Sequence, residues 1–161
     1  IDMKIPSELK HKPVIVSEDY DRIDGRKAHT SDAKGLSLGL AQWNERGNVD
    51  ISAKVWRHTG GKWSRQSEEL PLHRVLDLAI LIIKTKKVFS ERYHKNEKDY
   101  PNYPSLDRIG LQGDAMNVEV CTDNEFIQDD LDLFEATLAK DDEIISERLN
   151  ILTGLLKDLH T

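Results

Sequence analysis

The chain has 161 residues, of which 38% are hydrophobic and 32% are charged, and its net charge is −6. This length suits one domain, or one small domain with an appendage. Cys121 is the single cysteine, which excludes an internal disulfide, and the longest apolar run, Val75 to Ile83, is too short to span a bilayer. We therefore expect a soluble cytoplasmic protein with no membrane partner.

The charge is divided unequally along the chain. Residues 1–87 contain 16 Lys or Arg and 12 Asp or Glu, whereas residues 88–161 contain 7 and 17. The first part therefore has a net charge of +4 and the second a net charge of −10. A mildly basic half is compatible with a polyanionic partner, and we expect the two parts to have separate roles.

The first half of the chain predicts an antiparallel sheet. Leu36, Leu38 and Leu40 alternate with small residues, which is typical of a strand with one apolar face. Gly60-Gly61 is a strong signal for a two-residue hairpin, because both positions tolerate positive φ. The predicted strands cover residues 12–20, 36–43, 49–59 and 62–66.

A long helix is predicted next, from Pro71 to about Lys87. Its residues are apolar around nearly the whole circumference, so it must be buried on more than one side. We expect its own sheet to cover one side, and a second chain or the C-terminal half to cover the rest. Residues 89–121 are expected to form an irregular connector. Two amphipathic segments then predict an acidic antiparallel helical hairpin over residues 122–160, joined at Lys140-Asp141.

These elements predict an α+β fold with three parts. A four-stranded antiparallel sheet and its long buried helix form a domain over residues 12–88. The connector follows over 89–121, and the acidic helical hairpin over 122–160 packs with the first domain as one unit. Because the core of such a chain is small and its helix is apolar all round, we expect a homodimer.

One face of the predicted sheet is a candidate binding surface. Ser37, Gly39, Ala41 and Trp43 point to one side of their strand, and we expect Ser52, Lys54, Trp56 and His58 to oppose them. A face of small residues with aromatic residues at its edge admits a flat ligand closely. The same face would also suit burial beneath the helix or another subunit, with Trp43 and Trp56 as core residues.

Several short pieces of sequence carry a resemblance to a known family. They are LSLGLAQWN (36–44), Asp50-Ile51, Trp56, Gly60-Gly61 and the passage EELPL (68–72). In their order they resemble the positive-cofactor-four family of transcriptional coactivators, over roughly residues 12–88. The resemblance implies four strands followed by a helix, dimerisation through that helix, and binding of single-stranded DNA. The whole chain also looks like a bacterial family of uncharacterised proteins.

The residues and the resemblance together predict a non-enzymatic protein that binds single-stranded DNA or RNA, with a role related to transcription. Trp43 and Trp56 would stack on bases. Four cations would contact phosphates, which makes binding salt-dependent: Lys54, Arg57, Lys62 and Arg65. We find no motif for a catalytic residue, a metal site or a cofactor.

Two alternatives stay open. The first is a protein-interaction or scaffold module in which the sheet face is buried, with Trp43 and Trp56 beneath residues 89–161. The second is a small-molecule site or an enzyme in the region 89–121. That alternative requires Tyr93, His94 or Tyr100 to converge with a carboxylate in a pocket.

Overall fold

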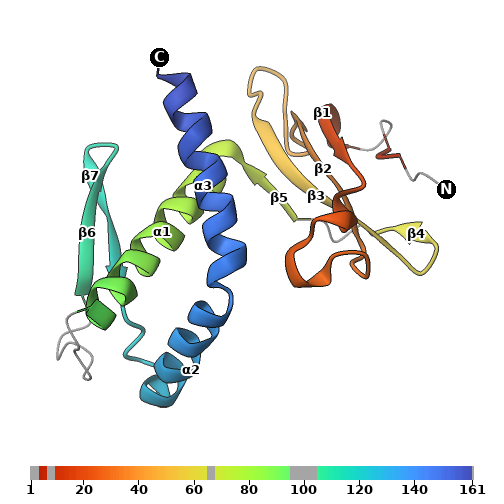
Figure 1. Ribbon diagram of the computed structural model, residues 1–161. Coiled ribbons are helices and arrows are strands. Elements are labelled where there is room, and N and C mark those ends of the chain that lie inside the picture. The colour runs from red at the N-terminus through yellow and green to blue at the C-terminus, as the bar shows by residue number, and fades with distance from the viewer. Residues whose placement is uncertain (1–3, 7–9, 65–67, 95–104, 161) are drawn as a thin grey trace. The chain divides into compact units, whose positions relative to one another are not determined.

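The computed structural model describes residues 4–6, 10–64, 68–94 and 105–160 (Figure 1). The chain divides into two compact units, Ile1–Ile80 and Leu81–Thr161, and each unit is described by itself. The predicted α+β class is confirmed: an antiparallel sheet, a long helix and two C-terminal helices are all present. The boundary between the two units lies inside the long helix.

An antiparallel sheet forms most of the first unit. Successive strands pair in the order β1-β2-β3-β4, and a further strand, β5, pairs with β3 beside the first residues of β3. Of the predicted fourth strand, Lys62 and Trp63 form β4, and the Ser64 N–H donates to the Arg57 carbonyl; the rest of that strand lies outside the described residues. The bounds are β1 Lys12–Glu18, β2 Ala33–Leu40, β3 Ile51–Thr59, β4 Lys62–Trp63 and β5 Glu68–Pro71.

The turn between β3 and β4 has the predicted chemistry. Gly60 and Gly61 have φ angles of 62° and 84°, so both central positions lie in the left-handed region that favours glycine. Pro71 differs from the prediction. It pairs with Ser52 as the last residue of β5, and the helix begins one residue later.

The register of β2 and β3 separates the residues of the sheet into two faces. Leu36, Leu38 and Leu40 lie opposite Val55, Ala53 and Ile51, so the predicted apolar face is confirmed. The residues between them, including Ser37 and Gly39, point to the other face. Short 3₁₀ turns at Tyr20–Arg22 and Gly25–Lys27 lie in the connection from β1 to β2.

The second unit contains the end of the long helix α1 (Leu72–His94), a β-hairpin and two helices. Strands β6 (Ser105–Leu111) and β7 (Asp114–Glu119) pair where the sequence predicted an irregular connector. The expectation was wrong because Gln112 and Gly113 both have positive φ, at 53° and 76°, and so make a tight hairpin turn.

Two further helices complete this unit, α2 (Ile127–Lys140) and α3 (Asp142–Leu159). Figure 1 shows that they follow one another with a bend between them, and Asp141 is the residue that separates them. They do not fold back on each other along their lengths, so the predicted antiparallel packing is not observed. Phe89 and Phe134 pack with ring centroids 5.6 Å apart. No helix in the described ranges combines the length and the apolar character needed to cross a membrane.

Candidate functional site

The face predicted to bind nucleic acid is enclosed in the folded first unit. Ser37 pairs with Lys54, and Gly39 pairs with Ser52, so these residues share one face with Trp56. The side chains are buried: Trp56 is 1% exposed and Lys54 is 7% exposed. In this arrangement neither ring face of Trp56 is available for stacking, and the Lys54 ammonium does not lie on the surface.

Ile5, His11 and the backbone of Lys12 lie against this face. Ile5 and His11 are both buried. A Cβ atom on Gly35 would lie 2.6 Å from Cδ1 of Ile5, and one on Gly39 would lie 2.1 Å from the carbonyl oxygen of Lys12. The small residues of β2 therefore admit Ile5 and the first residue of β1, which take the place of the flat ligand that the sequence suggested.

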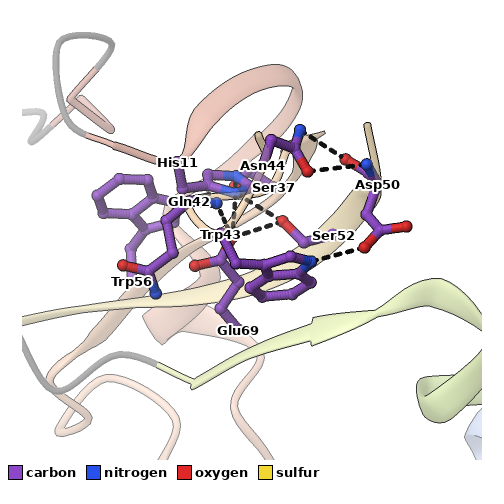
Figure 2. Close-up of polar contacts among 9 residues, drawn as sticks. All are labelled: His11, Ser37, Gln42, Trp43, Asn44, Asp50, Ser52, Trp56 and Glu69. Carbon is purple, nitrogen blue, oxygen red and sulfur yellow. Dashed lines mark hydrogen bonds and ion pairs between the residues drawn. The ribbon is translucent and has the colours of Figure 1, made fainter. Parts of the chain in front are cut away.

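His11 is the centre of a buried hydrogen-bond network (Figure 2). Its Nε2 lies 2.8 Å from Oγ of Ser37, and its Nδ1 lies 2.8 Å from Oγ of Ser52 and 3.0 Å from Oε1 of Glu69. The Ser52 hydroxyl donates to the same Glu69 oxygen at 2.7 Å, and Trp56 Nε1 donates to Ser37 at 2.8 Å. Three strands and the segment before β1 are thus connected through one imidazole ring.

The donors and acceptors of this network assign its protons. Trp56 Nε1–H donates to Ser37, whose own hydrogen is then directed to Nε2 of a neutral His11 ring. Nδ1 carries the remaining ring proton and donates it to Glu69. This connectivity is that of a Ser–His–acid triad. However, the Ser37 hydroxyl is enclosed between His11 and Trp56, so it does not face a substrate.

Glu69 and Lys54 supply opposite charges to the buried network. Burial alone would raise the pKa of Glu69, but hydrogen bonds from Ser52, the Gln42 N–H and His11 together hold it below its usual value. Its side chain is 2% exposed, and within the described residues Oε2 has no hydrogen-bond partner. Lys54 lies opposite Glu69 across the strand pair, with Nζ 3.8 Å from the Trp56 ring centroid. Burial lowers the pKa of Lys54, against the attraction of Glu69.

The other predicted cations are not gathered at this face. Arg57 makes ion pairs of 2.6 Å with both Asp32 and Glu68, and its hydrogen bonds to Glu68 and Asp32 raise its pKa. The Arg57 guanidinium is therefore already paired with two carboxylates of the same chain. Lys62 is exposed on β4, and Arg65 lies outside the described residues.

Trp43 stands apart from Trp56 at the end of β2. It is 40% exposed, and its Nε1 donates to Oδ2 of Asp50 at 2.7 Å. Asn44 closes the same loop, since its side chain bonds both the carbonyl and the N–H of Asp50 (Figure 2). The structure thus leaves Trp43 and Lys62 exposed, and it does not bring the five described members of the predicted set together as one site.

The apolar face on the other side of the sheet carries an open groove of about 580 Å³. Side chains of β1, β2, β3 and β5 line it together with Val75 of α1. Ile15 and Leu38 are among the large apolar side chains left exposed there. We call this surface the apolar sheet face, and it consists of Ile15, Leu36, Leu38, Leu40, Ile51, Ala53, Val55 and Leu70.

The remaining predicted sites lie partly outside the described residues. This holds for the side chains of Tyr93, His94 and Tyr100, so a small-molecule site in that region stays a prediction. Within the described ranges, no group of three or more His, Cys, Asp or Glu residues is arranged to hold a metal ion.

Sequence reasoning missed His11, Glu69 and Trp63. The ring of Trp63 lies 5.9 Å from that of Trp56 and 5.1 Å from that of His58, so an aromatic cluster forms at the β3–β4 hairpin. The available signal was the run of small residues in β2, which shows that something approaches closely. It does not show which segment does so.

Gly39→Ala should lower the free energy of unfolding by about 1–3 kcal/mol, because the new methyl group would overlap the Lys12 carbonyl oxygen. Urea denaturation monitored by circular dichroism measures this change. Gly110→Ala in β6 is the matched control, since no atom lies within 4 Å of a Cβ there, and it should change stability by less than about 0.5 kcal/mol. Equal effects of the two substitutions on stability would contradict the close approach of the Lys12 carbonyl to Gly39.

Comparison with known proteins identifies a family for this chain. Residues 3–161 match a family of unknown function, DUF6530, and the chain therefore belongs to that family. No curated protein matches the chain, and no solved structure matches it.

Proposed function

We propose that the protein is a non-enzymatic protein-interaction module and that the apolar sheet face is its docking surface. The observation that carries this proposal is the contrast between the two faces of one sheet. The polar face is filled by His11 and Ile5 of the same chain, whereas the apolar face keeps an open groove. Exposed apolar surface of this kind is typical of a protein–protein contact.

We infer that the occupant is a second copy of the chain. The groove continues onto the first turns of α1 through Val75, and Leu76 and Leu78 of the same helix are also exposed. A helix that is apolar on every side needs more than one covering surface. In a two-fold dimer the same face is used by both protomers, so one patch supplies both halves of the contact.

The energy of such a dimer is set by a few half-exposed side chains. Burying the exposed part of each contributes about 1 kcal/mol, and twelve such side chains in the dimer contribute about 12 kcal/mol. Association costs on the order of 4–15 kcal/mol, so the dimer is stable when nearly the whole face is covered. The six side chains in each protomer are between 41% and 63% exposed: Ile15, Leu38, Leu40, Ile51, Leu76 and Leu78.

Leu38→Glu should raise the dissociation constant of the dimer by about a hundredfold or more, because the interface would bury two unpaired carboxylates, one from each protomer. Analytical ultracentrifugation over a range of protein concentrations measures this, with far-UV circular dichroism to verify folding. Leu133→Glu is the matched control, since Leu133 is an exposed leucine on α2 and should leave the dimer intact. A wild-type protein that is monomeric at every concentration would exclude a second copy as the occupant. Dimerisation that Leu38→Glu does not weaken would exclude this face.

Binding of single-stranded nucleic acid is the second candidate. The exposure of Trp43 and Lys62 supports it, since one aromatic ring and one cation can still meet a base and a phosphate. Titration of a labelled oligonucleotide at low and moderate salt tests this candidate. Trp43→Ala should weaken the binding, and the absence of binding at low salt would remove the candidate.

A further inference from the structure

The imidazole ring of His11, the residue before β1, is held against the sheet by hydrogen bonds. It contacts one residue on each of three strands, Ser37 on β2, Ser52 on β3 and Glu69 on β5 (Figure 2). Its ring also meets the ring of Trp56 edge-on, with centroids 5.9 Å apart. This one side chain therefore closes the polar face beside Trp56.

We propose that His11 is a proton-sensitive latch: when the ring takes up a second proton, it leaves the sheet, and the Trp56 face opens to solvent. The latch lies on the face opposite the apolar groove, so it does not depend on the proposed dimer. The proposal is based on the hydrogen bonds made by the His11 ring and on the burial and charges around it.

The hydrogen bonds of the network suit the neutral ring. Trp56 donates to Ser37, Ser37 donates to Nε2 of His11, and Nδ1 of His11 donates to Glu69. A proton added at Nε2 would point at the Ser37 oxygen, which already accepts a hydrogen from Trp56. The Ser37 hydroxyl hydrogen would then lose its acceptor inside the protein, where an unsatisfied donor is costly.

Burial opposes protonation of the ring, whereas the two charges that face it act in opposite directions. The titratable groups that face the ring are Glu69 from β5 and Lys54 from β3, while β2 contributes Ser37, which does not titrate in this range. One negative and one positive charge already balance, so a proton on His11 would leave a net positive charge in a buried site. Burial accordingly lowers the pKa of His11, and Lys54 adds to this, against the hydrogen bond and the charge of Glu69.

The direction of the pH effect follows from this lowered pKa. His11 in the unfolded chain takes up a proton near its usual pKa of 6.5, and in the folded chain at lower pH. The His11 contacts therefore contribute their full stabilisation of the folded state above the unfolded pKa of 6.5. This stabilisation is lost as the pH falls through the folded pKa. Acid thus opens the latch, and base closes it.

The opening can stay local. The first residue of β1 is Lys12, which pairs with Leu40, so His11 lies outside the ladder and can withdraw without breaking it. The surface exposed would contain the Trp56 ring with the Lys54 ammonium 3.8 Å from its centroid. An aromatic ring with a cation beside it suits a flat or anionic ligand.

Tryptophan fluorescence of the full chain tests the latch. In a variant with Trp43→Phe and Trp63→Phe, the emission comes from Trp56. As the pH is lowered from about 8 through the range in which the folded His11 takes up its proton, quenching by acrylamide should increase several-fold and the emission should shift to the red. Far-UV circular dichroism of the same samples should not change, because the sheet stays paired.

His11→Gln in this background removes the titrating group, so the pH dependence should disappear. His58→Gln is the matched control, because His58 contacts Trp63 instead of the latch and should leave the transition in place. In the unsubstituted protein, an NMR titration should place the His11 pKa below 6.5 and coincident with the fluorescence change. Quenching independent of pH, a transition that survives His11→Gln, or simultaneous loss of the circular dichroism signal would each overturn the proposal.

Discussion

Trp56→Ala should lower the free energy of unfolding by about 3–5 kcal/mol, the range for deleting a large buried aromatic side chain. The indole is 1% exposed and contacts the rings of His11 and Trp63. Its removal would leave a cavity that these neighbours cannot fill, and Ser37 would lose the hydrogen bond that Trp56 Nε1 donates. The main effect of the substitution should therefore be a loss of stability of the folded chain.

Urea denaturation measures this effect as a shift of the midpoint with little change in slope. Trp43→Ala is the control, because Trp43 is 40% exposed, and it should lower stability by about 1 kcal/mol or less. The same variants separate a core role from a stacking role. If Trp56→Ala kept nearly wild-type stability and lost oligonucleotide binding, the core role of Trp56 would be wrong.

Glu69→Leu should also destabilise the protein by about 3–5 kcal/mol, because it removes a buried acceptor of several hydrogen bonds and the negative charge that acts on Lys54. Lys54 would keep a buried positive charge without its counter-charge, and His11 Nδ1 and the Gln42 N–H would lose their common acceptor. The loss is therefore expected from the groups left behind rather than from the carboxylate itself.

A double-mutant cycle tests this explanation. Glu69→Leu combined with Lys54→Met should be less destabilised than Glu69→Leu alone, because the uncompensated charge is gone. Glu68→Leu is the control on the same strand: its carboxylate is 53% exposed and pairs with Arg57, so its loss should cost less than about 1 kcal/mol. A double variant less stable than the single variant would contradict the charge pairing.

The elements that the sequence predicted well depend on local patterns. Leu36, Leu38 and Leu40 alternate with small residues, and the structure places them on one face of β2. Gly60 and Gly61 form the hairpin turn that their conformational freedom indicates. Both signals arise within a few residues, so they do not depend on what the rest of the chain does.

The predictions that differ from the structure required information from distant residues. The hairpin β6–β7 forms although its sequence lacks a strong alternation, and the bend between the two C-terminal helices replaces the expected return of α3 along α2. Arg57 was predicted to contact phosphate, but Asp32 and Glu68 lie on either side of it. Nothing in the local sequence indicates that these two carboxylates meet the same guanidinium.

The sequence by itself determined that one face of the sheet is apolar and the other nearly bare, because side chains alternate strictly along a strand. Only the tertiary structure decided what each face receives. His11 lies 58 residues from Glu69 and 26 from Ser37 along the chain, yet all three share one hydrogen-bond network. Such contacts depend on the pairing of distant segments, and neither composition nor periodicity specifies that pairing. For the same reason, the sequence could identify Trp56 as a notable residue, whereas its burial became apparent only in the folded chain.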